Sequence, residues 1–564
     1  MNRFIFLFIV FLSVIPYSLG QKQQEYGYHP PLKIPLILSS NFGELRPNHF
    51  HMGLDFKTNN RIGYRLYSIE DGFVSRIKVS PTGYGKVVYI DHPNGITSVY
   101  AHCSEFKGQL DSIVRITQIS EQNYAVEIFP KKNEIKVKKG QVIALSGNSG
   151  GSTAPHLHFE IRETKTEHAL NPLVYGFDIA DHKKPEIRGM KVYGLTKDGY
   201  QFNKKAVKKT ASKGKTNYYI SGSSIIIPAH YLSKSGGIGF AFDVIDRFDG
   251  ASNRCGLYGS ILIIDGDTIF GQQTDRVPFE SSRYVNSHKD YQEYAHLRRK
   301  YHKTFKTREN PLPIYTKQGL GIFKKAKPGG KYKVRYIAYD AKGNRSVLQF
   351  DLLILNGKIN SKDAIATDST YLIPSKTKRL TKGTTEVDFG RSTSYEPLKL
   401  DASKINYKIG NAETPVQNAY KIKMSLDDVQ DGKHYLDITT AKGKHRSINV
   451  LYDENLLIFE PKYFGTYKLK RDTIAPRVTP HNFKNATSSL NGKSLQWLIR
   501  DIETGIADYD LFINGKWVLL EYDGKKKKIT YTRDASFVGK KELLLKVVDD
   551  CGNVKVWKKV MVFN

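Results

Sequence analysis

The sequence His156-Leu157-His158-Phe159-Glu160 alternates polar and apolar side chains, which is the pattern of a β-strand with one buried face. Side chains two positions apart on a strand point to the same side and stand roughly 7 Å apart. We therefore expect His156 and His158 on one face of the strand and Leu157 and Phe159 on the other. Two imidazoles placed in this way can share one metal site, as ligand and as catalyst.

Two neighbouring features strengthen this interpretation. His51 and Asp55 lie four positions apart, about a hundred residues before the strand. The glycine-rich loop 146–155 runs directly into the strand, so backbone can pass close to a ligand without side chains in the way. Either histidine motif alone is more often an ordinary structural or surface feature than a site. Together, three of these groups would complete the ligand set of a catalytic zinc, which keeps a fourth position for water.

Several motifs between residues 35 and 175, about a quarter of the chain, occur in an order typical of one family. They are Asn41-Phe-Gly-Glu-Leu-Arg46, His51-x3-Asp55, Gly83-Tyr-Gly-Lys-Val-Val-Tyr-Ile-Asp91-His92, Tyr100-Ala-His102, Val137-Lys-Lys-Gly-Gln-Val-Ile143 and His156-Leu-His158-Phe-Glu160. This segment resembles the lysostaphin/LytM-type zinc metallopeptidases, which cleave peptidoglycan and have the duplicated-hybrid-motif fold.

The resemblance implies a role for each matched residue. His51, Asp55 and His158 match the zinc ligands, and His102 and His156 match the two catalytic histidines that do not bind the metal. All five are present, so family members that have lost their metal and only activate other hydrolases are a poorer match. The implied cofactor is one Zn²⁺ per chain.

The residue types suggest how such a site would work. The sequence lacks the helical H-E-x-x-H motif that would place a glutamate base, so we expect His102 and His156 to share the proton transfers. One would take a proton from water, and the other would stabilise the oxyanion or protonate the leaving amine; the sequence does not order them. Glu160 lies on the same strand face and is expected either to orient an imidazole or to be a solvated carboxylate.

The fold is expected to be mostly β, because the hydrophobic period stays at two after residue 175. We expect residues 107–134 to form an inserted hairpin at the rim of the cleft, and helix only in the signal and in residues 286–303. The predicted units are a signal peptide (1–20), a LytM-type zinc peptidase domain (21–175), an immunoglobulin-like β-sandwich (176–356), a β-rich module (357–471) and a second immunoglobulin-like β-sandwich (472–564).

The two predicted β-sandwiches share a sequence pattern. Asp181-x3-Pro185 and Asp472-x3-Pro476 each open a strand-rich unit. Near the end of each unit an Asp-x2-Gly-Asn turn lies between two strands, at residues 340–344 and 549–553. The common pattern predicts two similar folds. Their protein partners are left open, as is whether they position the peptidase, bind a partner or cover the cleft.

The amino terminus predicts export. A positive start at Arg3, the apolar run 4–16 and small residues up to Gly20 are typical of a secretory signal that is removed before Gln21. We expect a protein of the periplasm or cell envelope with no transmembrane segment in the mature chain. Three widely spaced cysteines cannot all pair, so the chain is not a disulfide framework.

The charge balance indicates an anionic partner outside the cytoplasm. The chain has 87 Lys+Arg against 55 Asp+Glu, a net charge of +32. The basic residues are spread through strand-like segments and no nucleic-acid motif is present, so we expect peptidoglycan or another anionic envelope polymer and not nucleic acid. The four lysines 525–528 follow Asp523-Gly524 and are expected to form a solvated hairpin turn, with a binding patch as the alternative.

Three functions remain open at this point. The first is an exported zinc metalloendopeptidase that hydrolyses amide bonds in the peptide stems or cross-links of peptidoglycan. The second is a non-enzymatic wall-binding or scaffolding protein whose peptidase-like domain regulates other hydrolases. The third keeps the zinc chemistry but directs it at secreted proteins or glycine-rich peptides. The five matched residues favour the first.

Overall fold

The computed structural model describes residues 27–202, 205–360, 370–426, 432–483, 494–533 and 537–563. Strands dominate and helices are few, which confirms the expected mostly-β class. The predicted signal peptide, residues 1–20, lies outside the described residues. Among the residues that are described, no helix is long and apolar enough to cross a membrane.

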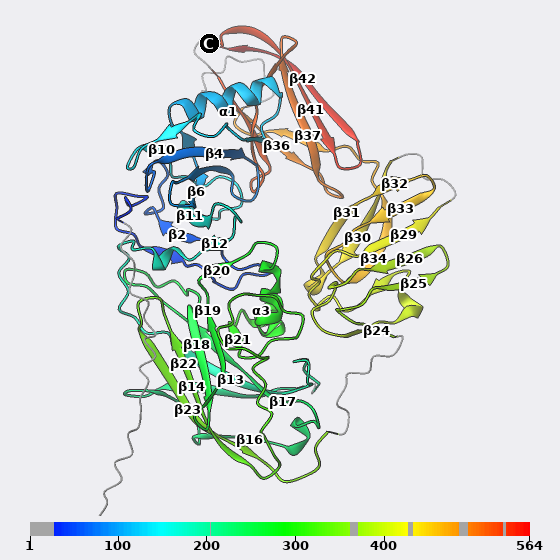
Figure 1. The fold of residues 1–564 in the computed structure, drawn as a ribbon. Coiled ribbons are helices and arrows are strands. Elements are labelled where there is room, and N and C mark those ends of the chain that lie inside the picture. The colour runs from blue at the N-terminus through cyan, green and yellow to red at the C-terminus, as the bar shows by residue number, and fades with distance from the viewer. Residues whose placement is uncertain are drawn as a thin grey trace, which may run out of the picture.

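The amino-terminal part of the chain is built on one antiparallel sheet (Figure 1). Its strands run in the order β1 (Leu38–Ser40), β2 (Leu54–Lys57), β11 (His156–Glu163), β6 (Ile96–Cys103), β5 (Lys86–Asp91), β4 (Gly72–Val79) and β8 (Val126–Ile128), and β9 (Lys136–Val137) also pairs with β4. A smaller sheet has the order β3 (Arg65–Tyr67), β10 (Val142–Leu145) and β7 (Glu105–Phe106). The histidine strand β11 is therefore a central strand, paired on both sides.

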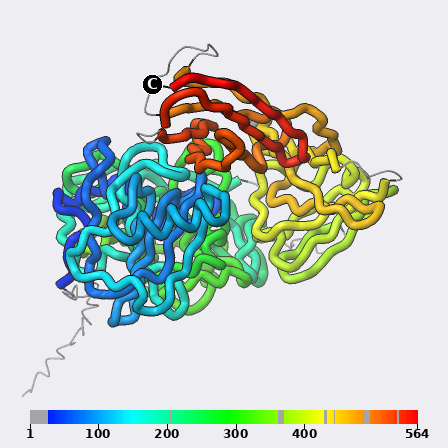
Figure 2. The backbone as a smooth tube through the Cα atoms, turned by 90° about the horizontal axis from the view of Figure 1, so that it is seen from above, coloured from blue at the N-terminus to red at the C-terminus, as the bar shows by residue number. Residues whose placement is uncertain are grey.

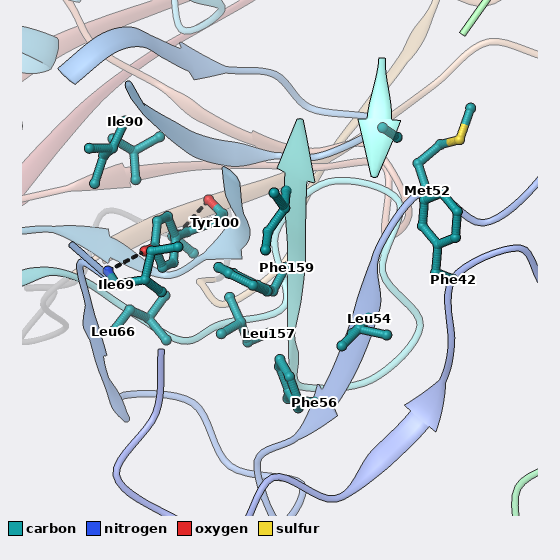
Figure 3. Close-up of a cluster of buried hydrophobic side chains, with 14 of the residues drawn as sticks. Phe42, Met52, Leu54, Phe56, Leu66, Ile69, Ile90, Tyr100, Leu157 and Phe159 are labelled. Carbon is teal, nitrogen blue, oxygen red and sulfur yellow. Dashed lines mark hydrogen bonds between the residues drawn. The ribbon is translucent and has the colours of Figure 1, made fainter. Parts of the chain in front are cut away.

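The alternation of β11 fixes its orientation in the sheet. Leu157 and Phe159 are completely buried in a cluster that also contains Phe56 and Tyr100 (Figure 3). Burying a side chain of this size stabilises the fold by roughly 1.5–3 kcal/mol. A shift of one residue in register would exchange this apolar face for the histidine face, so core packing holds the imidazoles on the opposite side.

The expectation for residues 107–134 is wrong. Gln109–Ser120 forms the helix α1 in place of one arm of a hairpin, and only β8 follows it as a strand. The buried side chains of α1 are Leu110, Val114 and Gln118, spaced by four, which is the period of a helix face. The alternation at the end of this segment belongs to β8 alone.

The next part of the chain, predicted as the first β-sandwich and called by that name below, forms one long sheet. Their order is β19 (Asp267–Gln273), β18 (Gly259–Ile264), β22 (Lys331–Tyr339), β23 (Arg345–Ile354), β15 (Tyr218–Ile220), β14 (Val207–Lys213), β13 (Glu186–Leu195), β17 (Gly237–Ile245) and β21 (Tyr301–Lys303), with β16 (Ser224–Ile227) beside β23. The helix expected in residues 286–303 is present as two short helices, α2 (Val285–His288) and α3 (Tyr291–Leu297), before β21.

The first β-sandwich and the amino-terminal domain share one hydrophobic core. The short strands β12 (Ala169–Leu170) and β20 (Arg276–Val277) pair across the two units. Phe248, Val277 and Tyr294 of the sandwich belong to the same buried cluster as the peptidase-like sheet. The predicted boundary at residue 175 remains a prediction, and the packing across it is continuous.

Two further β units complete the described chain. In the third unit, one sheet has the order β25 (Lys378–Lys382), β26 (Thr385–Phe389), β29 (Lys421–Ser425), β33 (Leu456–Phe459) and β32 (Leu451–Asp453). A second sheet has the order β28 (Lys408–Ile409), β34 (Gly465–Arg471), β30 (His434–Thr439) and β31 (His445–Asn449), and β24 (Tyr371–Leu372) and β27 (Leu398–Lys399) form a separate pair. In the fourth unit, one sheet has the order β35 (Arg477–Pro480), β36 (Ser494–Arg500), β40 (Lys528–Thr532) and β39 (Glu521–Asp523). The other sheet has the order β38 (Lys516–Val518), β37 (Ile506–Ile513), β41 (Gly539–Asp549) and β42 (Val554–Phe563).

The four units follow one another around a ring (Figure 1), and the view from above shows the carboxy-terminal unit beside both the amino-terminal domain and the third unit (Figure 2). Arg283 Nη2 of the first sandwich donates to Val416 O of the third unit at 2.6 Å. Lys433 Nζ donates to Cys551 O between the third and fourth units at 2.9 Å. Lys86 Nζ and Glu521 Oε1 close the ring, 3.2 Å apart. Segments more than 400 residues apart in sequence are thereby brought to the histidine site.

Candidate metal centre

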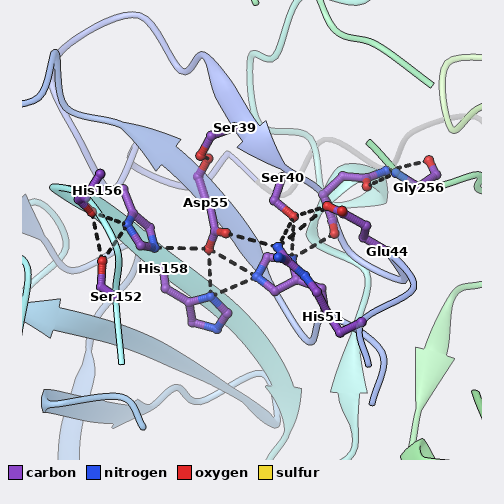
Figure 4. Close-up of polar contacts among 12 residues, drawn as sticks. Ser39, Ser40, Glu44, His51, Asp55, Ser152, His156, His158 and Gly256 are labelled. Carbon is purple, nitrogen blue, oxygen red and sulfur yellow. Dashed lines mark hydrogen bonds and ion pairs between the residues drawn. The ribbon is translucent and has the colours of Figure 1, made fainter. Parts of the chain in front are cut away.

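Three side chains converge at the polar face of β11 and β2 (Figure 4). His51 Nε2 lies 3.1 Å from Asp55 Oδ1 and 3.1 Å from His158 Nδ1, and His158 Nδ1 lies 2.9 Å from Asp55 Oδ1. Two imidazole nitrogens and one carboxylate oxygen are the donors that zinc prefers. The geometry therefore places the three predicted ligands around one point.

Strand register explains this convergence. In the ladder between β2 and β11, Asp55 is the partner of His158. His51 reaches the same point from the loop before β2. In that loop, a Cβ on Gly53 would stand only 2.4 Å from Phe159 O, so the close approach to β11 requires glycine.

Hydrogen bonds on the far side of each ring set its tautomer. His51 Nδ1 lies 2.8 Å from the carbonyl oxygen of Asn41, and His158 Nε2 lies 2.8 Å from Glu160 Oε1. Because a carbonyl or carboxylate oxygen can only accept, these ring nitrogens carry the protons. When the two rings are neutral, the free electron pairs are therefore on the opposite nitrogens, His51 Nε2 and His158 Nδ1, both of which lie beside Asp55 Oδ1. This outer arrangement is the one that orients metal-binding imidazoles.

Glu160 is the centre of the outer network. It is completely buried, accepts a hydrogen bond from the Tyr84 hydroxyl and another from Arg162 Nε at 2.7 Å, and also faces His158. Burial raises the pKa of this carboxyl, but the charge of Arg162 and the bond to His158 outweigh burial and lower it to about 2. Of the two expected roles, orientation of an imidazole is therefore the one that the structure supports.

The same contacts act on His158. Burial alone would lower its pKa, but hydrogen bonds to Asp55 and Glu160 outweigh burial and raise it to about 9. A metal ion bound at His158 Nδ1 would displace the proton that the carboxylates of Asp55 and Glu160 otherwise stabilise on this imidazole. Metal binding here is thus expected to release a proton.

Glu160→Gln tests this network. All three partners of Glu160 are hydrogen-bond donors, and the amide NH₂ would face one of them without an acceptor. We expect zinc affinity to fall roughly 10- to 100-fold, the usual effect of losing such an outer contact. A competitive zinc titration measures it. Glu163→Gln, at the half-buried end of the same strand, is the matched control and should keep wild-type affinity; equal affinities in both variants would contradict the assignment.

His102 and His156 lie beside the three convergent atoms. Their ring centroids are 4.8 Å apart, and His156 Nε2 lies 3.4 Å from Asp55 Oδ1. His102 Nδ1 lies 2.9 Å from Ser149 O, and His156 Nδ1 lies 2.8 Å from Ala154 O. Both rings thus carry their proton on Nδ1 and leave Nε2 free to accept one.

The electrostatic surroundings of His102 keep it neutral. Burial, followed by the charges of His158 and His156, lowers its pKa to about 3. Its backbone is in the left-handed region at a φ of 61°, which is uncommon for a residue other than glycine and often marks a functional site. A neutral imidazole with a free Nε2 is suited to accept a proton at neutral pH.

The glycine-rich loop holds both of these histidines. Its carbonyls at Ser149 and Ala154 accept from the two rings. The loop lies so close to the turn around Gly85 that a Cβ on Gly150 would be 2.3 Å from Gly85 N. Gly150 also has a φ of 67°. The close packing of backbone on backbone explains why this loop is rich in glycine.

Several residues around the site were missed by sequence reasoning. Asn41 exchanges two hydrogen bonds with Gly256 of the first sandwich, at 3.0 and 2.7 Å. Glu44, which accepts a hydrogen bond from the Ser40 hydroxyl, pairs with Lys300 Nζ at 2.8 Å. Arg162 could have been found, because it continues the every-second-residue pattern of β11. No local signal points to Lys300.

Known proteins match the same segment. The sequence model of peptidase family M23 matches residues 49–121 and 122–172. Residues 49–172 form a peptidase family M23 domain. This confirms the resemblance to lysostaphin/LytM-type peptidases at the level of the family.

Curated relatives share this domain and little more. An uncharacterized metalloprotease of Haemophilus influenzae is 34% identical over 131 residues, which are 23% of this chain and 21% of that protein. The peptidoglycan DD-endopeptidase ShyB of Vibrio cholerae is 32% identical over 146 residues, 26% of each chain. The DD-carboxypeptidase/endopeptidase Mpg of Neisseria meningitidis is 29% identical over 145 residues, 25% of this chain and 27% of that one. The chain spans about a quarter of the length of these relatives.

Among solved structures, the catalytic domain of the prophage-encoded M23 protein EnpA from Enterococcus faecalis aligns with 27% of this chain and 99% of its own. The identity is 25% and the TM-score is 0.20.

Proposed function

We propose that this protein is an exported zinc metalloendopeptidase that hydrolyses amide bonds in the peptide stems or cross-links of peptidoglycan. The observation that carries the proposal is the convergence of His51 Nε2, Asp55 Oδ1 and His158 Nδ1 within 3.1 Å of one another, with two further imidazoles beside them. Peptidoglycan as substrate is supported by relatives named as peptidoglycan endopeptidases. The net charge of +32 favours an anionic envelope polymer as the binding surface.

The roles proposed for the residues follow from their hydrogen bonds. His51, Asp55 and His158 would hold the zinc ion, which when bound polarises a peptide carbonyl and lowers the pKa of water towards about 7. His102 Nε2, neutral and unprotonated, takes a proton as the nucleophile attacks. This proton then goes to the leaving amine, and His156, whose Nε2 lies 3.4 Å from Asp55 Oδ1, would relay it or, while protonated on Nε2, stabilise the oxyanion.

The test is the mass of fragments released from purified, cross-linked muropeptides by the full-length protein, together with elemental analysis for zinc. About one zinc per chain is expected, together with pairs of fragments whose masses sum to the mass of the precursor plus one water. If only glycine-rich bridges are cleaved, the substrate is a glycine-rich peptide, as the name of the glycyl-glycine endopeptidase ALE-1 of Staphylococcus capitis indicates for that protein, which is 28% identical over 143 residues. Intact muropeptides beside a zinc-loaded protein would favour the non-enzymatic alternative.

The carboxy-terminal unit contacts the loop that holds the catalytic histidines. The turn between β39 and β40 is a hairpin, as expected, but Lys525 is not merely solvated. Its Nζ donates to Asn148 O at 2.5 Å and to Ser152 O at 2.8 Å. The Ser152 hydroxyl in turn lies 3.1 Å from His156 Nδ1. The hairpin therefore braces the glycine-rich loop.

Lys525→Ala is expected to lower turnover on muropeptides about 2- to 10-fold and to leave zinc content unchanged. The reason is that hydrogen bonds from a charged donor contribute about 1.5 kcal/mol or more, and their loss frees the loop that positions His102 and His156. Lys526→Ala is the matched control, because Lys526 lies in the same hairpin and faces Asp523. A rise in turnover would instead show that the hairpin restricts the cleft.

A further inference from the structure

Three aspartates gather at the end of the first β-sandwich that faces the peptidase domain. Asp181 precedes β13, Asp246 follows β17, and Asp340 lies in the turn between β22 and β23. One carboxylate oxygen from each lies within 4.8 Å of the other two. Their exposed fractions are 7%, 1% and 2%, so all three are buried. Carboxylates rarely cluster in the interior without a positive partner.

One oxygen of this cluster has no hydrogen bond. Asp181 Oδ2 is enclosed and lacks a partner among the described residues, whereas Asp181 Oδ1 accepts from Lys183 N at 3.2 Å. Both oxygens of Asp340 accept hydrogen bonds from Asn344, which hold its carboxylate in place. A buried carboxylate oxygen without a donor is costly, and a cation would satisfy it.

Nearby basic side chains are directed to other groups. Lys183 Nζ donates to Phe248 O at 3.0 Å, and Arg247 Nε pairs with Glu186 Oε1 at 2.6 Å. His182 Nδ1 pairs with Asp249 Oδ2 at 2.6 Å. The positive charge of Lys342 acts on Asp181 and offsets part of the repulsion.

The pKa values of these carboxyls are raised, as expected for buried negative charges that no positive charge fully offsets. Burial, and next the charge of Asp340, raises the pKa of Asp181 to about 7. Burial and the charge of Asp181 also raise the pKa of Asp246 well above its usual range. The three side chains thus repel one another in the absence of a bound cation.

We propose that Asp181, Asp246 and Asp340 bind a calcium ion at the junction of the peptidase domain and the first β-sandwich. The donors are all oxygens, which selects a hard cation. Calcium–oxygen distances near 2.4 Å allow two ligand oxygens to lie up to about 4.8 Å apart, and the three aspartate oxygens lie within that limit. Three protein carboxylates suit calcium, which accepts flexible ligand geometry, better than magnesium, which requires a nearly regular octahedron and usually keeps several waters.

The loop that begins at the proposed calcium site leads to the groups that orient His51 in the metal centre. The loop 246–256 begins at the calcium site, contributes Phe248 and Cys255 to the shared core, and ends at Gly256. Gly256 holds Asn41, whose carbonyl accepts from the ligand His51. Calcium at the first residue of this loop would therefore stabilise the junction on which the orientation of His51 depends.

The matching cluster of the carboxy-terminal unit differs. Asp472, Asp501 and Asp549 also lie within 4.8 Å of one another. There, however, Asp472 Oδ2 accepts from the Thr504 hydroxyl at 2.8 Å. Because this oxygen already has a donor, we propose no cation at that cluster.

Calcium binding to the full-length, zinc-loaded protein is measured by isothermal titration and by thermal unfolding in calcium-free buffer and at about 1 mM CaCl₂. The wild type should bind calcium with a Kd of roughly 10⁻⁴ to 10⁻³ M or tighter and unfold at a higher temperature when calcium is present. Asp181→Asn should weaken this site at least tenfold. Asp267→Asn, an exposed aspartate of the same unit, and Asp472→Asn should leave it unchanged.

Unfolding without calcium provides a readout that a folding defect would not mimic. Asp181→Asn removes one of three repelling carboxylates, so the variant should unfold at a higher temperature than the wild type in calcium-free buffer and gain less from added calcium. The proposal is overturned if the wild type shows neither binding heat nor a thermal shift, if Asp181→Asn keeps wild-type affinity, or if it is destabilised equally with and without calcium. Equal affinity for Mg²⁺ would overturn the assignment to calcium.

Discussion

His158→Ala is expected to lose most of its bound zinc and to reduce turnover on muropeptides by at least about 10⁴-fold, because the polarising metal is lost with its ligand. The substitution removes the nitrogen that lies 2.9 Å from Asp55 Oδ1 and 3.1 Å from His51 Nε2. It also leaves the buried Glu160 without one of its three donors, so the free energy of unfolding should fall.

Zinc stoichiometry by elemental analysis, measured beside turnover, checks this result. His445→Ala is the control for removal of a histidine, since His445 is an exposed residue of the third unit that pairs with Asp437. His158→Gln, which keeps more of the side-chain volume, separates loss of the ligand from loss of packing. If His158→Ala keeps about one zinc per chain, the ligand assignment within the His156/His158 pair is reversed.

His102→Ala and His156→Ala are expected to keep zinc near one per chain while turnover falls roughly 10²- to 10⁴-fold, the usual range for a group that transfers a proton or stabilises an oxyanion. Both rings donate Nδ1–H to loop carbonyls, and His156 Nε2 lies 3.4 Å from Asp55 Oδ1. Their loss therefore removes proton transfer and leaves the three convergent ligand atoms in place.

His102 needs a second variant because its φ is 61°. Alanine is strained there, whereas asparagine adopts this conformation more readily, so His102→Asn should fold at least as well and be equally slow. Zinc content and turnover are measured for all three variants. Wild-type turnover in all of them would contradict the zinc-peptidase mechanism. Loss of zinc from His156→Ala would show that His156 is a ligand.

Much of the metal centre could be predicted from local sequence because strand periodicity is local. Every second residue of β11, from His156 to Arg162, lies on one face, and the apolar residues between them lie in the core. Asp265-Gly266 and Asn514-Gly515 have the sequence signature of two-residue hairpin turns, and they join β18 to β19 and β37 to β38, because such turns depend on the residues within them. Helix α1 was missed although its apolar spacing of four was visible.

The sequence by itself determined the family, the mostly-β class and the five histidine and aspartate side chains that meet at the site, because spacing along a strand decides which face a side chain occupies. Only the tertiary structure decided which groups surround them. Lys300 pairs with Glu44 across 256 residues of sequence, and Lys525 reaches Asn148 across 377. Contacts of this range depend on how whole sheets pack against one another, and no local periodicity encodes them. The same holds for Asp181, Asp246 and Asp340, which come from three separate strand ends and meet only because the first β-sandwich folds.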